Sequence, residues 1–321
     1  MKAIVYTKYG PPDVLQLKEV EKPTPRDDEV LIKAHAASAN AGDWHLLRGK
    51  PFLVRLMGYG LLKPKHKILG FDIAGRIEAV GRNVKQFQPG DEVFGVLSGG
   101  GFAEYACASE IALVLKSASM TFEEAAAVPV AALTALQGLR DKGQIQAGQK
   151  VLINGAGGGV GTFAVQIAKS FGAEVTAVCS TRKLDMVRSI GADQVIDYTR
   201  EDFTKNGQHY DLILDVAAYR SVLDYKRVLS PKGIYVMAGG SVGRLLQVMF
   251  LGPWISMTGS KRMGFMGVAK TNKKDLDFLK ELLETGKVVP VIDRRYMLSE
   301  TAEALRYLEE GQARGKVVIT V

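Results

Sequence analysis

One stretch, residues 151–161, constrains the fold of this chain more than any other. It reads VLINGAGGGVG, so a β-branched and apolar run passes directly into a cluster of glycines. An apolar pattern with helical spacing follows, through Ala164, Val165, Ile167 and Ala168. Glycines let a backbone approach a phosphate closely, and the free N–H groups and dipole of a helix N-terminus favour negative charge. The strand, turn and helix therefore predict a dinucleotide-binding site.

The spacing of these glycines and the residues that follow them indicate which dinucleotide binds. From Ala156 the pattern is A-x-G-x-x-G, in which alanine replaces the first glycine of the usual fingerprint. In NAD-selective sites an acid ends the next strand, about 20 residues on. Here residues 179–183 read CSTRK, and the Ser180 hydroxyl and Lys183 ammonium suit a 2′-phosphate that a carboxylate would repel. We predict NADPH; the alternative, in which Ser180 caps the next helix and Lys183 is solvated, stays open.

The composition excludes several classes of protein. The 321 residues suffice for two domains, and the apolar fraction of 47% and charged fraction of 24% are those of a globular protein. Two cysteines, Cys107 and Cys179, and four scattered histidines do not form a metal-ligand pattern. We therefore predict no metal site and no disulfide framework.

Charge and hydropathy indicate which partners the chain has and where it is located. The formal net charge of +8 fits either ordinary surface charge or an anionic partner. We interpret the basic residues as spread along the chain, without interleaved aromatic residues, and so predict no nucleic-acid binding. The N-terminus lacks the pattern of a signal peptide, and no apolar stretch reaches about 18 residues. These features predict a cytoplasmic protein without a transmembrane segment.

The chain changes character along its length. The part up to about Lys116 is rich in strand-like runs, glycines and prolines, and a capping box at residues 121–124 opens an alanine-rich helix. From Val151 strands and helices alternate, which predicts an α/β fold with a doubly wound parallel sheet. The expected strands are 151–154, 175–179, 194–197, 210–215, 234–238 and 255–258. We expect a cofactor domain at 121–286, a substrate domain at 1–120 and 287–321, and the substrate between them.

Seven short motifs occur in the order typical of one enzyme family. They are NAGD at 40–43, LGFDIAG at 69–75, PGDEV at 89–93, GFAEY at 101–105, LTA at 133–135, the glycine run with QIAK at 166–169, and GADQVIDY at 191–198. Nearly the whole chain thereby resembles the medium-chain dehydrogenase/reductase superfamily, specifically its zinc-free quinone oxidoreductase (zeta-crystallin-like) branch. The resemblance implies a GroES-like β-rich catalytic domain and a Rossmann domain that binds NADPH.

The chain departs from the zinc alcohol dehydrogenases at their metal positions. In those relatives a ligand histidine lies in a G-H-E motif, whereas residues 70–72 read GFD here. Asn40 or a neighbouring small residue matches the first zinc cysteine, and no four-cysteine lobe separates Phe94 from Gly101. A catalytic zinc needs about three protein ligands and a structural zinc about four. The resemblance therefore implies hydride transfer to an already activated acceptor, without zinc.

The resemblance also assigns residues to the parts of the cofactor. The pyrophosphate would be bound by Gly157, Gly158, Gly159 and Val160, the 2′-phosphate and adenosine end by Ser180, Lys183 and Tyr198, and the nicotinamide end by Thr134, Asn40 and the backbone of Gly239. Each has a structural alternative: Tyr198 as a half-buried strand-end side chain and Asn40 as a turn residue. We expect Met237 to be a core residue and Asp72 to make structural hydrogen bonds.

His45 is the second candidate catalytic residue beside Asn40. Several relatives carry a tyrosine near this position, and a histidine can exchange a proton near neutral pH. We interpret His45 as a possible proton donor, with an ordinary surface histidine as the alternative.

Two further segments are rich in apolar residues. Residues 46–68 mix apolar side chains with Lys50, Arg55 and other cations; the segment fits a substrate lid, a peripheral contact with an anionic membrane, or an insertion packed on its own domain. We expect residues 245–257 to form core and dimer contact, because the sixth-strand region of relatives pairs across a dimer interface.

The predicted activity is zinc-independent, NADPH-dependent reduction of a quinone or an α,β-unsaturated carbonyl. A conjugated carbonyl disperses the negative charge that arrives with the hydride. For hydride transfer the protein therefore needs only to orient the acceptor and to stabilise its oxyanion modestly. Reduction of an enoyl thioester or aldehyde is the nearest alternative, and a non-catalytic NADPH-binding protein is the other. The expected partners are a small hydrophobic electrophile and a second copy of the chain in a homodimer.

Overall fold

The computed structural model describes the backbone of all 321 residues and every side chain except those of Leu53, Met57 and Gly58. Leu53 and Met57 are two of the apolar residues of the segment 46–68 that the sequence assigns to a lid, a membrane contact or a packed insertion, and this prediction for their side chains lies outside the described residues. The chain forms two compact units, the first comprising Met1–Ala131, Thr271–Glu284 and Pro290–Val321, and the second Ala132–Lys270 and Thr285–Val289. The domain boundaries expected at 120/121 and 286/287 stay predictions.

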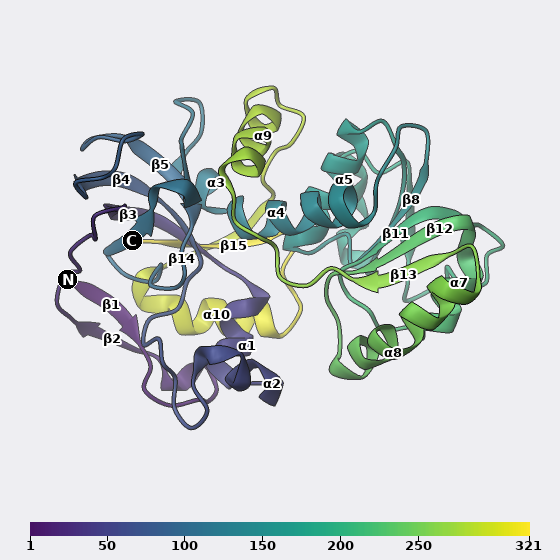
Figure 1. Ribbon diagram of the computed structural model, residues 1–321, viewed down its shortest axis with the longest axis horizontal. Helices are drawn as coiled ribbons and strands as arrows, with labels where there is room; N and C mark the ends of the chain where they lie inside the picture. Colours follow the sequence, from purple (N-terminus) through teal and green to yellow (C-terminus); the bar gives the residue numbers. More distant parts are fainter. The chain divides into compact units, whose positions relative to one another are not determined.

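The first unit is built on a seven-stranded sheet with a small hairpin beside it (Figure 1). The sheet strands are β3 (Glu29–Ala39), β4 (Asp72–Val80), β5 (Glu92–Val96), β6 (Tyr105–Ser109), β7 (Leu113–Leu115), β14 (Ile292–Met297) and β15 (Lys316–Thr320); β1 (Lys2–Val5) and β2 (Gln16–Glu19) form the hairpin. The long strand β3 pairs antiparallel with β4, β6 and β15. The prediction that the C-terminal tail rejoins the first part of the chain is therefore confirmed.

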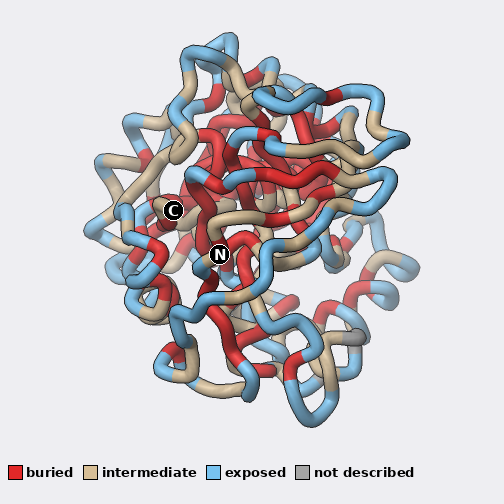
Figure 2. The backbone as a smooth tube through the Cα atoms, turned by 90° about the vertical axis from the view of Figure 1, so that its left-hand side faces the viewer, coloured by how far each residue is buried: buried red, intermediate tan, exposed pale blue. Residues whose placement is uncertain are grey.

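The first unit also contains helices, several of which pack on this sheet. The helices of this unit are α1 (Ala41–Arg48), α2 (Phe52–Val54), α3 (Phe122–Ala126), α9 (Lys273–Glu284) and α10 (Thr301–Glu309). The N–H of Asn40 bonds to the Asp43 carboxylate at the start of α1, and Gly49, at φ +59°, ends the helix. Buried side chains of β3, β15, α1 and α10 form one core, and the strands of this unit are buried (red) inside exposed loops (Figure 2).

The second unit contains a six-stranded, fully parallel sheet in the order β10-β9-β8-β11-β12-β13. The strands are β8 (Lys150–Asn154), β9 (Glu174–Cys179), β10 (Gln194–Asp197), β11 (Tyr210–Asp215), β12 (Leu229–Met237) and β13 (Arg262–Phe265). Its helices are α5 (Gly159–Ser170), α6 (Leu184–Ser189), α7 (Val222–Val228) and α8 (Val242–Thr258), while α4 (Pro129–Gln137) runs across the unit boundary. Helix α5 covers one face of the sheet and α7 and α8 the other (Figure 1). This strand order is that of a doubly wound Rossmann sheet, so the predicted fold class is confirmed.

The strand predicted at 255–258 is wrong, because these residues end helix α8, and the sixth strand is β13. The Ser241 hydroxyl accepts a hydrogen bond from the Arg244 N–H and starts the helix. The buried side chains of α8, Val248 and Ile255 with the partly buried Leu245, repeat at helical rather than alternate spacing. The prediction weighed the local apolar run of residues 255–258 above this longer period.

No helix among the described residues reaches the length and apolarity that crossing a membrane requires.

Candidate active site

The glycine run joins β8 to α5 through a turn that only glycine fits. Gly155 has φ +82°, a conformation that other residues rarely adopt. A Cβ atom on Gly161 would lie 2.2 Å from the Gly155 carbonyl oxygen, so a side chain there would separate the helix from the turn. Glycine at position 161 therefore allows the start of α5 to pack closely against the turn.

The N-terminus of α5 has the features of a phosphate-binding site. Gly158 is the N-cap and carries no side chain that could satisfy the first N–H groups, and the first intrahelical bond of the cap runs from Thr162 N–H to Gly158 O. Helix geometry directs the N–H groups of Gly159, Val160 and Gly161 out of the helix end. The first turn carries no acidic residue, so the helix dipole favours an anion there. A pyrophosphate fits these residues.

Lys183 and the glycine turn, predicted separately from the sequence, lie together in the structure. A Cβ atom on Gly157 would lie 2.5 Å from Cδ of Lys183, which shows that the lysine stem crosses the turn. Ser180 follows β9 directly and is the N-cap of the short 3₁₀ turn Thr181–Lys183, yet its hydroxyl makes no capping hydrogen bond within the described chain. The alternative in which the Ser180 side chain caps the next helix is therefore not what the structure shows.

Tyr198 is one of two tyrosines at the carboxyl edge of this sheet. It follows β10 and is 46% exposed, and its ring centroid lies 5.8 Å from that of Tyr219, which follows β11. Nearby, Asp197 accepts hydrogen bonds from the hydroxyls of Thr181 (2.5 Å) and Thr199 (2.7 Å), which lower the pKa of its carboxyl. The acid at the end of β10 is thus already engaged. Tyr219 was not predicted, because an aromatic residue in a loop gives no periodic signal.

Gly239 and Thr134 are placed by packing. A Cβ atom on Gly239 would lie 2.3 Å from the Val216 carbonyl oxygen, and its N–H and C=O bond to Asp215 and Ala218. The residues that follow β11 and β12 approach each other too closely for a side chain at position 239, which explains why this residue is glycine. Contact of Gly239 with a cofactor stays a prediction. Thr134 is half-buried on α4. Met237 is 1% exposed, which confirms its expected place in the core.

Asn40 belongs to a buried polar network in the first unit. Its amide nitrogen donates to the Asp72 carboxylate (2.8 Å) and to the Ser38 carbonyl (3.3 Å), and its amide oxygen accepts from Lys316 Nζ (2.7 Å). Both amide donors are thus used within the protein, and the residue is 8% exposed. Asn40 is held rigidly, and contact of its side chain with a nicotinamide stays a prediction.

A buried ion pair anchors that network. Lys316 Nζ lies 3.2 Å from Asp72 Oδ2, with the side chains 2% and 0% exposed. Asp72 also accepts hydrogen bonds from the Ser38 hydroxyl (2.6 Å) and the Val130 N–H (2.9 Å). The expected structural role of Asp72 is confirmed. Lys316 was not predicted, although a lysine that opens the apolar run KVVIT was an available signal.

Asp43 is a second buried carboxyl that the prediction did not single out. Its two oxygens accept hydrogen bonds from the backbone N–H groups of Gly70 (2.9 Å) and Asn40 (2.8 Å). Burial raises its pKa to about 7, against the lowering effect of those two N–H groups. Through these two hydrogen bonds Asp43 joins the start of α1 to Gly70.

The raised pKa of Asp43 predicts a pH-dependent stability effect. Because the folded-state pKa lies above the unfolded value of 3.8, the folded protein holds a proton that the unfolded chain releases, so this contribution to stability is lost as the pH rises from about 4 to 7. Asp43→Asn removes the effect. Its cost in unfolding free energy should therefore be about 2–3 kcal/mol larger at pH 5 than at pH 8. Urea unfolding at both pH values measures this difference, and an equal cost at both would contradict the assignment.

His45 lies in the last turn of α1. Its ring stacks on Trp44, with centroids 3.8 Å apart, and Nδ1 lies 2.9 Å from the Lys50 carbonyl oxygen. Because a carbonyl only accepts, Nδ1 must carry a proton, so Nε2 is the ring atom that can gain or lose one. The side chain is half-buried, which leaves the proton-donor hypothesis geometrically possible.

The segment 46–68 is fastened to its own unit. The Arg55 guanidinium lies 4.3 Å from the Tyr9 ring centroid, and its Nε donates to the Gly49 carbonyl (3.0 Å). The Tyr9 hydroxyl donates to the Gly60 carbonyl (2.5 Å). These contacts support the interpretation of the segment as an insertion packed on its own domain.

The residues at the zinc positions of the alcohol dehydrogenases do not fit a zinc ion. Phe71 offers a phenyl ring, and the Asn40 amide is fully bonded. Among the described residues, no three His, Cys, Asp or Glu side chains are grouped as metal ligands would be. We therefore derive no chemistry through zinc.

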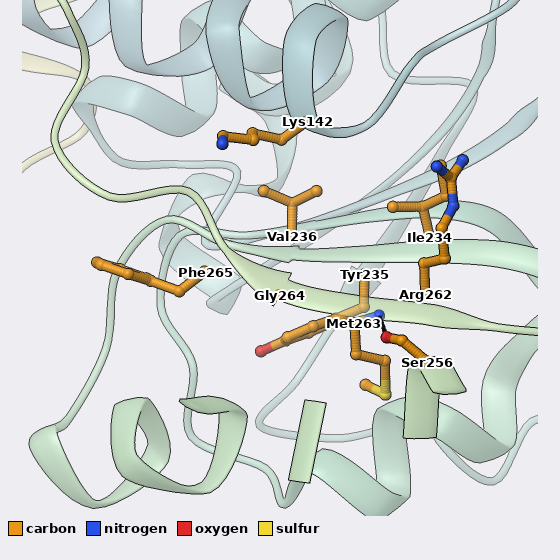
Figure 3. A pocket seen from close by; sticks show the side chains of 9 residues that line it. All are labelled: Lys142, Ile234, Tyr235, Val236, Ser256, Arg262, Met263, Gly264 and Phe265. Atoms are coloured by element: carbon orange, nitrogen blue, oxygen red, sulfur yellow. Dashed lines mark hydrogen bonds between the residues drawn. The ribbon is translucent and has the colours of Figure 1, made fainter. Parts of the chain in front are cut away.

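A cavity of about 210 Å³ lies at the outer strands of the second unit and includes none of the predicted site residues. Figure 3 shows Lys142 and Val236 on one face of the sheet and Tyr235 and Met263 on the other. The cavity thus surrounds the edge strand β13, away from the glycine turn.

Comparison with known proteins identifies the family. Two family models match, the alcohol dehydrogenase GroES-like domain over residues 26–118 and the zinc-binding dehydrogenase over residues 190–319. The 2-methylene-furan-3-one reductase of Solanum lycopersicum is 37% identical over 99% of this chain and 79% of its own length. This chain belongs to the medium-chain dehydrogenase/reductase superfamily. The predicted resemblance is confirmed, and the protein is an oxidoreductase of that superfamily.

Two further superfamily members are similar over most of their length. The chloroplastic NADPH-dependent alkenal/one oxidoreductase of Arabidopsis thaliana is 35% identical over 99% of this chain and 79% of its own. The solved structure of the quinone oxidoreductase from Coxiella burnetii is 31% identical, with a TM-score of 0.87 over 100% of this chain and 99% of its own. The latter match places the chain in the quinone oxidoreductase branch. The cytoplasmic location expected from the sequence stays a prediction.

Proposed function

We propose that this protein uses NADPH to reduce quinones or α,β-unsaturated carbonyl compounds, without a metal ion. One observation supports the cofactor assignment most strongly. The aliphatic part of the Lys183 side chain crosses the glycine turn beside Gly157, and the Ser180 hydroxyl, three residues earlier, makes no capping hydrogen bond. The names of the Solanum, Arabidopsis and Coxiella relatives support the acceptor class. Small hydrophobic electrophiles are therefore the proposed substrates, and a homodimer the proposed assembly.

The second unit supplies the groups that would hold NADPH. The N–H groups of Gly159 and Val160 would bind the pyrophosphate, as they are directed out of the helix end. Ser180 and Lys183 would bind the 2′-phosphate by charge-assisted hydrogen bonds, and the exposed Tyr198 would border the adenosine end. When bound, the nicotinamide ring supplies a hydride equivalent to the acceptor.

An activated acceptor suits the residues that are present. A conjugated carbonyl spreads developing negative charge over several atoms, so the protein needs no Lewis acid to stabilise it. The bonded amide of Asn40 and the ring of Phe71 at the zinc positions agree with such a reaction. The network of Asp72 and Lys316 would hold the Asn40 amide in a fixed orientation.

His45 is the proposed proton donor to the reduced acceptor. The Lys50 carbonyl orients the ring through Nδ1, and the protonated ring would release a proton from Nε2. His45→Gln should lower kcat about tenfold or more at neutral pH. It should also remove the part of the pH dependence of kcat that arises from proton donation by His45. His45→Asn tests the same loss with a shorter side chain. Unchanged turnover of both variants at all pH values would exclude His45.

Product analysis distinguishes this activity from its alternatives. An enone reduced with NADPH that carries deuterium at the transferable position should give a saturated ketone with the label on the β-carbon. Label at the carbonyl carbon, in an alcohol product, would favour the aldehyde reductase alternative. An enoyl thioester as the preferred alkene would favour the thioester alternative, and NADPH binding without product from any acceptor would favour a binding protein.

A further inference from the structure

Helix α8 presents an unusually apolar surface to solvent. Its inner side chains, including Val248 and Ile255, are part of the core of the second unit. The opposite side carries Val242, Leu246, Met249, Phe250, Trp254 and Met257, which we call the outer face of α8; Phe250 is 75%, Trp254 60% and Met257 86% exposed. These positions repeat every three or four residues and so form one continuous stripe. Large contiguous apolar patches on a protein usually mark a contact site.

The chain segment that contains this stripe carries charge of one sign, starting just after Asp224 of the neighbouring helix α7. Between Tyr225 and Lys270 the chain contains no Asp or Glu, although it has 34 in total, and it contains seven basic residues: Lys226, Arg227, Lys232, Arg244, Lys261, Arg262 and Lys270. The basic residues are about as dense here as elsewhere in the chain, so the positive charge of this segment comes from its lack of acids. A surface that is apolar in the middle and positive around it is complementary to an anionic, amphipathic partner.

Two of these cations lie together beside the outer face of α8, and a third is on the helix itself. Lys226 Nζ lies 5.9 Å from the Trp254 ring centroid, and Lys261 Nζ donates to the Lys226 carbonyl at 2.7 Å. Burial and the neighbouring Lys226 charge lower the pKa of Lys261, as expected where positive charges crowd. Arg244, on α8 itself, is held by the Tyr219 carbonyl (3.2 Å) and by Gln247 (2.9 Å).

We propose that the outer face of α8, with Lys226 and Lys261 at its border, docks the protein on a membrane that contains anionic lipids. The helix would lie flat, because its inner side chains are fixed in the core and its 17 residues span only about 25 Å. Phe250, Trp254 and Met257 would enter the boundary between headgroups and acyl chains, and the cations would contact lipid phosphates. This inference concerns where the protein acts and does not depend on its proposed function.

A second copy of the chain fits this surface less well. In a two-fold symmetric dimer the same patch meets itself, so the positive border of one copy would face the positive border of the other. With no acid between Tyr225 and Lys270, that arrangement offers no compensating charge within the region. The edge strand β13 lies beside α8, where the Met263 N–H donates to the Ser256 hydroxyl at 3.0 Å, so the vesicle experiment is paired with a measurement of the oligomeric state.

Cosedimentation of the full-length protein with lipid vesicles tests the proposal. We expect binding to phosphatidylcholine vesicles that contain phosphatidylserine, little binding to phosphatidylcholine alone, and weaker binding at high salt. The double variant Phe250→Ser with Trp254→Ser should lower the partition coefficient about tenfold or more. Lys226→Gln should lower it about fivefold. Ile111→Ser, which changes a side chain 58% exposed in the first unit, is the matched control and should bind as the parent does.

Two results would overturn the proposal: no binding to anionic vesicles, or binding that the double variant leaves unchanged. If the parent protein binds no vesicles and instead sediments as a dimer that the double variant dissociates, the outer face of α8 is a protein interface. Circular dichroism confirms that each variant is folded, so loss of structure cannot be mistaken for loss of docking.

Discussion

Replacement of Lys316 by methionine is expected to lower the free energy of unfolding by about 3–5 kcal/mol. Asp72 is fully buried and Lys316 Nζ lies 3.2 Å from its carboxylate, so the variant leaves that carboxylate in the interior without its cation. The amide oxygen of Asn40 loses its hydrogen-bond donor in the same step. Removal of one partner of a buried pair therefore costs far more than the pair itself contributes.

Urea unfolding measures this effect, and a second variant separates charge from packing. Adding Asp72→Asn to Lys316→Met removes the buried charge, so the double variant should recover part of the loss even though it lacks both ions. If the free energy of unfolding of Lys316→Met lies within about 1 kcal/mol of that of the parent protein, the ion pair is not structurally important.

Replacement of Ser180 by aspartate is expected to lower kcat/KM for NADPH at least about a hundredfold while changing that for NADH much less. The carboxylate would stand directly after β9, where it would repel a 2′-phosphate and accept a bond from a 2′-hydroxyl. The nearby Lys183 stem stays on the glycine turn, so the pyrophosphate site remains intact.

Steady-state kinetics with both cofactors give the ratio that decides this prediction. Ser180→Asn is the matched control, because it has nearly the same shape without the charge, and it should lie between the parent protein and Ser180→Asp. A cofactor ratio unchanged in Ser180→Asp would show that the 2′-phosphate is bound elsewhere, or that the protein does not select NADPH.

Much of the fold could be predicted from local patterns. The run from β8 through the glycines to α5 predicts a strand, a turn and a helix, because such a tight turn requires glycine at positions 155 and 161. Five of the six parallel strands follow from short β-branched runs. The sixth was misplaced, since residues 255–258 look like a strand until the longer helical period through Val248 is considered.

The buried polar groups of the first unit could not be predicted in the same way. Asp43, Asp72 and Lys316 are far apart in the sequence, and only the pairing of β3 with β4 and β15 brings their elements together. Likewise, Tyr198 and Tyr219 become neighbours because two strands end at the same edge of the sheet. Such contacts depend on tertiary structure rather than on local residue type or spacing.

The proposed activity is tested most directly by NADPH oxidation against a small panel of acceptors. The panel holds a quinone, an enone, an enoyl thioester and an aldehyde, with NADH and a metal chelator as controls. We predict acceptor-dependent NADPH loss with the quinone or the enone, unaffected by the chelator and slower with NADH. No oxidation with any acceptor, despite stoichiometric NADPH binding, would contradict the assignment as a reductase.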